Sequence, residues 1–106
     1  MKYGLEMKEE LRPISIADPF ARRLMTQYLE RRVRDLKSLS EALDNADFAT
    51  IGHTAHKLYG SGSAYGLDEV TKLGGALEAA AEIRNSAAVA ALIEELKRYL
   101  LCLRLT

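Results

Sequence analysis

The sequence predicts an all-α domain that folds as an antiparallel four-helix bundle with a short N-terminal extension. Three observations support this fold class. Apolar residues recur at helical spacings along most of the chain, whereas the alternation typical of strands is nearly absent. Only 2 prolines and 7 glycines interrupt the 106 residues. The connections between the apolar stretches are short, so consecutive helices must pack against one another.

Residues 1–14 form the predicted extension, either a tail or a short helix, and residues 15–106 form the predicted bundle. Residues 5–11 are rich in charged side chains. Pro13 lacks the N–H group that a helix needs, so any helix in this segment ends there. We expect residues 14–16 to be an extended lead-in that packs on the core.

The first helix is expected to begin at Asp18 and to end near Asn45. Asp18 is a favourable N-cap, and Pro19 suits the first helical position. The predicted core-facing residues of this helix are Phe20, Leu24, Tyr28, Val33, Leu36, Leu39 and Leu43. Its basic side chains form either a solvated face or a partner-binding patch; they are Arg22, Arg23, Arg31, Arg32, Arg34 and Lys37.

Three further helices follow. The second is predicted over residues 48–64, with Asp47 as its cap and Gly66 as a left-handed terminator. The third is predicted over residues 67–84, and the fourth begins with Ser86 as its cap. The apolar residues of the fourth helix are Val89, Leu92, Leu96, Tyr99, Leu100 and Leu103. The leucines near the end of the chain belong either to the core or to a dimer contact; they are Leu100, Leu101 and Leu103.

The charge balance excludes several classes of function. The 15 basic and 15 acidic side chains sum to a net charge of zero, which argues against a general nucleic-acid binder and against a polybasic membrane anchor. No apolar run is long enough to span a bilayer, and the first residues lack the apolar segment of a signal peptide. The single cysteine, Cys102, fits a reducing compartment. We therefore expect a cytoplasmic protein with no membrane insertion and no nucleic-acid partner.

The predicted second helix carries the unusual residues of the chain. At about 100° per residue, its core face comprises Phe48, Ile51, Ala55, Leu58 and Gly62. His53, Lys57 and Gly60 point roughly the opposite way, His56 lies on the flank, and Tyr59 lies nearer the edge of the core. Gly60 costs the helix roughly 0.5–1 kcal/mol relative to alanine. Either Gly60 arose by sequence drift or marks a mild kink, or it leaves the surface beside His56 without a side chain so that another protein can approach.

Three interpretations of His56 follow from its position. It is a solvated surface residue, a nucleophile, or a metal ligand together with His53. A neutral imidazole has a ring nitrogen that can attack phosphorus. Two histidines alone are too few for a closed zinc site, and no Cys or acidic motif nearby completes one. We therefore expect no metal.

The segment Ala55-His56-Lys57-Leu58-Tyr59-Gly60-Ser61, followed by Gly66, resembles the signature of histidine-containing phosphotransfer (HPt) domains. The family pattern is roughly Ala-His-x-Leu-Lys-Gly-Ser, a glycine at the helix end, and a later helix that ends in Leu-Glu. Leu73, Leu77 and Glu78 match that later portion. The resemblance covers about residues 15–106.

This resemblance implies a four-helix bundle in which His56 accepts a phosphoryl group from the aspartate of a receiver domain and passes it to another receiver. Gly60 matches the glycine that permits docking, and Ser61 matches the small polar residue after it. The implied partners are response-regulator receiver domains and a sensor or hybrid histidine kinase. The chain would need no cofactor of its own, since magnesium belongs to the receiver, and it would have no kinase activity. The alternative function is a non-catalytic helical interaction module that resembles an HPt domain but does not transfer phosphoryl groups.

The sequence departs from the family pattern at Tyr59, where the family usually has a lysine that contacts the phosphoryl oxygens. The nearby lysine here is Lys57. We expect Lys57 to substitute in part and the Tyr59 hydroxyl to donate a hydrogen bond. A hydroxyl lacks the positive charge, so the phosphohistidine should be less stable.

Overall fold

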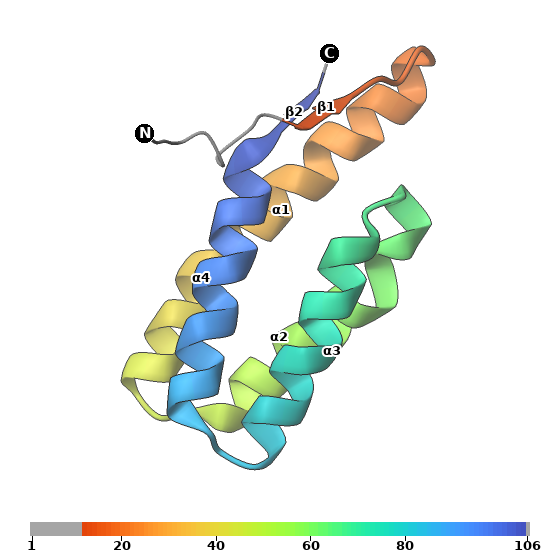
Figure 1. The fold of residues 1–106 in the computed structure, drawn as a ribbon. Helices are drawn as coiled ribbons and strands as arrows, with labels where there is room; N and C mark the ends of the chain where they lie inside the picture. The colour runs from red at the N-terminus through yellow and green to blue at the C-terminus, as the bar shows by residue number, and fades with distance from the viewer. Residues whose placement is uncertain (1–11, 106) are drawn as a thin grey trace, which may run out of the picture.

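The computed structural model of the chain describes residues 12–105 (Figure 1). Within this range the helices are α1 (Pro19–Asp44), α2 (Phe48–Ser61), α3 (Asp68–Glu82) and α4 (Ser86–Cys102). Successive helices run in opposite directions, and each packs chiefly on two neighbours in a ring from α1 through α4 back to α1 (Figure 1). The predicted antiparallel four-helix bundle is confirmed.

The first two helices begin at the predicted aspartate caps. The Asp18 carboxylate accepts a hydrogen bond of 2.8 Å from the backbone N–H of Ala21, and Pro19 occupies the first turn. The Asp47 carboxylate accepts hydrogen bonds from the Thr50 hydroxyl at 2.6 Å and from the Thr50 backbone N–H at 3.1 Å. These two hydrogen bonds hold the pKa of Asp47 below its ordinary value, and the one from the hydroxyl has the larger effect.

The fourth helix is capped one residue earlier than predicted. The Asn85 side-chain oxygen accepts a hydrogen bond of 3.0 Å from the backbone N–H of Ala88, so Asn85 is the cap and Ser86 is the first helical residue. Both residue types are good caps, and the sequence alone did not distinguish between them.

The second and third helices are shorter than predicted. α2 ends at Ser61 rather than at residue 64, because the chain tightens into the 3₁₀ turn η1 (Ser63–Tyr65). Gly66 then adopts the predicted left-handed conformation, with φ at 74°. α3 ends at Glu82 rather than at residue 84, because Arg84 itself has a left-handed φ of 56°.

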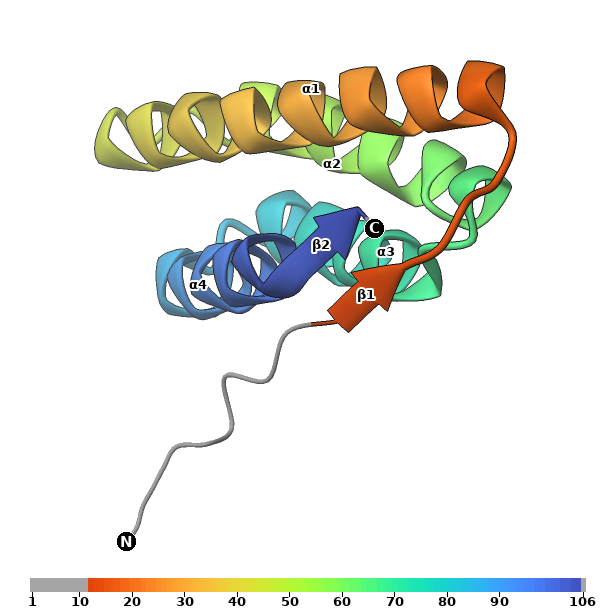
Figure 2. The same ribbon diagram turned by 90° about the horizontal axis from the view of Figure 1, so that it is seen from above.

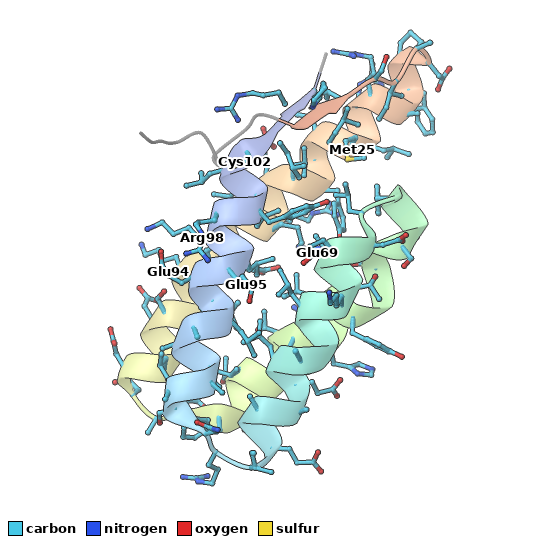
Figure 3. All side chains as sticks on the ribbon, viewed as in Figure 1. Met25, Glu69, Glu94, Glu95, Arg98 and Cys102 are labelled. Atoms are coloured by element: carbon cyan, nitrogen blue, oxygen red, sulfur yellow. The ribbon has the colours of Figure 1, made fainter. Side chains whose placement is uncertain are left out.

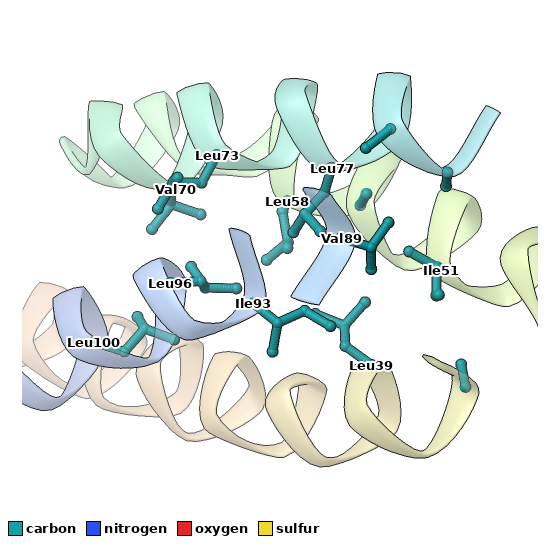
Figure 4. Close-up of a cluster of buried hydrophobic side chains, with 14 of the residues drawn as sticks. Leu39, Ile51, Leu58, Val70, Leu73, Leu77, Val89, Ile93, Leu96 and Leu100 are labelled. Carbon is teal, nitrogen blue, oxygen red and sulfur yellow. The ribbon is translucent and has the colours of Figure 1, made fainter. Parts of the chain in front are cut away.

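One apolar core lies between the four helices (Figure 4). Its central side chains include Leu39 of α1, Ile51 and Leu58 of α2, Val70, Leu73 and Leu77 of α3, and Val89, Ile93, Leu96 and Leu100 of α4. Burial of these apolar side chains is the main contribution to the stability of the bundle.

The core face of α1 was predicted only in part. The predicted residues that pack in or against the core are Tyr28, Leu36, Leu39 and Leu43. Phe20, Leu24 and Val33 are instead 62%, 38% and 47% exposed. The buried residues that the prediction missed are Met25, Arg32 and Ala42. A helix turns about 100° per residue, so the step of five from Tyr28 to Val33 carried Val33 about 140° around the helix and off the inward face.

The end of the chain is divided between core and surface. Leu100 and Leu103 are buried, whereas Leu101 is 53% exposed. Leu103 lies beyond α4, in a short strand that the all-α prediction did not include. In the fourth helix the prediction also missed Ile93, which is buried.

That strand, β2 (Leu103–Leu105), pairs in parallel with β1 (Arg12–Ile14), so the two ends of the described chain lie side by side (Figure 2). Ile14 and Ile16 pack against the core, which holds the residues before α1 in place. Residues 1–11, where a tail or a short helix was predicted, lie outside the described range.

The outer face of α4 is charged, with Glu94, Glu95 and Arg98 exposed (Figure 3). None of the helices in the described part of the chain has both the length and the apolarity required to cross a membrane.

Candidate functional site

The face of α2 that the sequence assigned to the core is buried in the structure; it comprises Phe48, Ile51, Ala55, Leu58 and Gly62. The other side of the helix is open to solvent, with His53, Lys57 and Gly60 exposed as predicted. His56 lies on the flank that faces α3, and 68% of its side chain is exposed. Its imidazole is therefore accessible to another protein.

His56 has one polar partner from the neighbouring helix. Its Nδ1 lies 3.1 Å from Oε2 of Glu78 on α3. A carboxylate can only accept a hydrogen bond, so in the neutral ring Nδ1 carries the hydrogen and this N–H group donates the hydrogen bond to Glu78. Nε2 then keeps its lone pair for reaction. The sequence had used Glu78 only as part of the family resemblance, not as a site residue.

The close packing of α2 and α3 allows this contact. A Cβ on Gly74 would clash with the Tyr59 backbone nitrogen and would lie 2.9 Å from the Ala55 carbonyl oxygen. The two backbones therefore touch at Gly74 with no side chain between them. Glu78 follows one turn later on the same face of α3, opposite His56.

Gly60 lies one turn beyond His56 and has no packing role among the described residues. A Cβ at this position would meet no heavy atom within 4 Å. The surface next to His56 is therefore bare backbone, although alanine would fit there and would favour the helix.

The Tyr59 ring leans onto α3 and forms a wall beside His56. A Cβ on Gly75 would lie 3.1 Å from the ring's Cδ1, so the absence of a side chain on Gly75 makes room for it. The Tyr59 and His56 ring centroids are 6.4 Å apart. Tyr59 is 53% exposed, which is more than the sequence suggested, and its hydroxyl has no hydrogen bond within residues 12–105.

Lys57 lies on the other side of His56, toward α1. Helical geometry separates the two side chains by about 100° around the axis of α2. Lys57 is exposed and makes no ion pair or hydrogen bond with any residue that the structure describes. Its ammonium group is thus free to contact an anion.

Ser61 is not part of the surface around His56. Its Oγ lies 2.8 Å from the Tyr28 hydroxyl and accepts a longer hydrogen bond of 3.5 Å from Arg32, both on α1. The Tyr28 ring stacks on that of Tyr65 with the centroids 4.0 Å apart. These contacts fasten the end of α2 and η1 to α1.

This cluster corrects the prediction for the basic side chains of α1. Arg32 is only 9% exposed; its guanidinium lies over the Tyr28 ring at 4.5 Å and pairs with Asp35 at 2.8 Å. Arg32 is therefore a structural residue rather than a member of an exposed face. The basic residues of α1 that are exposed are Arg23, Arg31, Arg34 and Lys37.

His53 borders an open hollow of about 440 Å³ that adjoins the His56–Glu78 pair. The hollow lies between α2 and α3, and Gly52, Glu78 and Arg84 are among its lining residues. Within residues 12–105 no three His, Cys, Asp or Glu side chains are grouped so as to hold a metal ion. The described residues therefore supply no third ligand to His53 and His56.

A comparison with protein-family models matches residues 23–104 to the Hpt domain. The matched range contains all of α2, α3 and α4, and with them His56 and Glu78. Comparisons with the curated proteins and with the solved structures gave no match.

Proposed function

The chain belongs to the Hpt domain family, and from this membership we propose that His56 accepts a phosphoryl group from a receiver-domain aspartate and passes it to another receiver. Hpt domains carry out phosphotransfer in phosphorelays, together with receiver domains and histidine kinases. The observation that carries the assignment to His56 is its 68% exposed imidazole, whose Nδ1 is held by Glu78. The protein then acts as a phosphocarrier in the cytoplasm, with no kinase activity of its own.

The transfer step follows from the orientation of the ring. Nε2 attacks the phosphorus of the aspartyl phosphate, and the N–P bond forms as the P–O bond breaks. The electron pair of the broken bond remains on the aspartate carboxylate. The hydrogen on Nδ1 remains bonded to the ring and keeps its hydrogen bond to Glu78. The negative charge of Glu78 offsets the positive charge that develops on the ring. In the second transfer the N–P bond breaks and its electron pair returns to Nε2.

The receiver supplies most of the remaining catalysis. Magnesium and the charges that stabilise the transferring phosphoryl group belong to the receiver site. The contribution of this chain is a nucleophile on a rigid helix, beside the bare surface at Gly60 where a partner can approach closely.

Glu78→Ala is expected to lower the rate at which His56 becomes phosphorylated by about tenfold, because the ring loses the group that sets its tautomer and orientation. The measurement is the rate of label transfer from a phosphorylated receiver. The imidazole ¹⁵N chemical shifts should change as well, since they report which ring nitrogen carries the proton. Glu78→Gln keeps an acceptor oxygen and should recover part of the rate; equal rates in all three proteins would contradict this role.

Lys57→Ala is expected to shorten the lifetime of phospho-His56 by about fivefold, since the free ammonium group can contact the phosphoryl oxygens at an exposed site. The lifetime is measured as the loss of label after the phosphorylated domain is separated from its donor. Tyr59→Phe tests the hydroxyl in the same assay. A lifetime unaffected by Lys57→Ala would remove Lys57 from the site.

The experiment that tests the function is incubation of the domain with phosphorylated receiver domains. We expect an acid-labile and base-stable label, as a phosphoramidate requires. No label from any receiver would instead support the alternative, a helical interaction module that does not transfer phosphoryl groups. Tyr59, which replaces the usual lysine, is the residue that favours this alternative.

A further inference from the structure

A second surface lies on α1, on the flank that faces away from α2. Here an open groove of about 420 Å³ lies between α1 and β2. Its lining residues are Thr26, Leu29, Glu30, Val33, Arg34 and Leu105. Val33, an apolar residue of this lining, is 47% exposed. The floor of the groove is therefore apolar surface left in contact with water.

The groove is separate from the site around His56. The His56–Glu78 contact bridges α2 and α3, whereas the groove lies between α1 and the strand that follows α4. In the ring of helices these are opposite edges of the bundle. A partner in the groove would leave His56 accessible.

The rim of the groove carries two opposite charges, neither of which is paired with a residue that the structure describes. Glu30 and Arg34 are one helical turn apart, a spacing that often supports an ion pair within a helix. Both are exposed, yet neither makes an ion pair or a hydrogen bond with any residue between 12 and 105. One acidic and one basic group are thus available to a partner with the same two charges in the reverse order.

We propose that this groove is a self-association surface, in which α1 of a second copy packs antiparallel across a two-fold axis near residue 32. Residue 32 lies midway between Glu30 and Arg34, the two charged residues on the rim of the groove. Glu30 of one copy then faces Arg34 of the other, and the reverse pair follows by symmetry. Leu29 of each copy then lies near Val33 of the other on the inner side of the contact, and Leu105 of each copy adds apolar surface. The charges are complementary only in this antiparallel arrangement.

Charge exchange tests this arrangement. The wild-type chain should sediment as a dimer at high concentration and dissociate on dilution over a roughly hundredfold range. Glu30→Arg places two positive charges opposite two positive charges, and Arg34→Glu does the same with negative ones. Each single variant should therefore dissociate at a concentration at least about tenfold higher. The double variant restores both pairs and should regain the dimer.

A mixture of the two single variants provides the sharpest test. Their charges are complementary, so the mixture should form heterodimers at concentrations at which each variant alone is dissociated. Far-ultraviolet circular dichroism of each variant confirms that the helices are intact. A wild-type chain that stays monomeric at every concentration, or a double variant that fails to regain the dimer, overturns the proposal.

Deletion of residues 1–11 tests whether these residues, rather than a second copy of the chain, occupy the groove. If the wild-type chain is monomeric and only the shortened chain dimerises, residues 1–11 bind in the groove and the proposal is wrong. Phosphorylation of His56 is a separate measurement and is expected to be the same in all the charge variants.

Discussion

His56→Gln is expected to abolish phosphorylation of the domain by a phosphorylated receiver. Glutamine has no ring nitrogen with an available lone pair, so no N–P bond can form at this position. The substitution should leave the fold intact, because the side chain is 68% exposed and glutamine is a good helix former. The measurement is the amount of acid-labile label, with the helix content recorded by circular dichroism.

His53→Gln is the matched control. His53 lies on the same helix and is exposed, but the hydrogen bond to Glu78 is made by His56. The His53→Gln domain should take up label as the wild-type domain does. Label retained in His56→Gln, or lost in His53→Gln, would show that the acceptor has been assigned to the wrong residue.

Gly74→Ala is expected to have the largest effect on stability, a loss of about 1–3 kcal/mol from the free energy of unfolding. The added methyl group would lie 2.8 Å from the Leu58 Cβ and 2.9 Å from the Ala55 carbonyl oxygen. These are fixed parts of α2, so the two helices must separate. Urea denaturation measures the loss. The separation also moves Glu78 away from His56, so the rate of phosphorylation should fall together with stability.

Gly60→Ala is the matched control, because its methyl group meets nothing within 4 Å. The higher helix propensity of alanine should stabilise the domain by about 0.5–1 kcal/mol. The same methyl group covers the bare surface beside His56, so transfer from a receiver should slow. Two outcomes would contradict this interpretation of the glycines: a Gly74→Ala domain as stable as the wild type, or a Gly60→Ala domain less stable than it.

The helices were predictable because their signals are local. Asp18, Pro19 and Asp47 mark helix starts by their own side chains, and Gly66 marks a stop by its conformational freedom. The prediction failed where a residue's environment is set by distant parts of the chain. The burial of Arg32, for example, depends on the Tyr28 ring and on Ser61 of α2, 29 residues further along.

The sequence by itself determined the four helices, the outward face of α2 and the histidine on it, since periodicity and capping depend on residues a few positions apart. Only the tertiary structure decided which groups surround that histidine. The contact between His56 and Glu78 depends on how closely α2 and α3 approach and how each is rotated about its axis, which neither helix specifies alone. The same holds for the inward position of Ser61 and for the groove between α1 and β2, because both are formed by segments far apart in the chain.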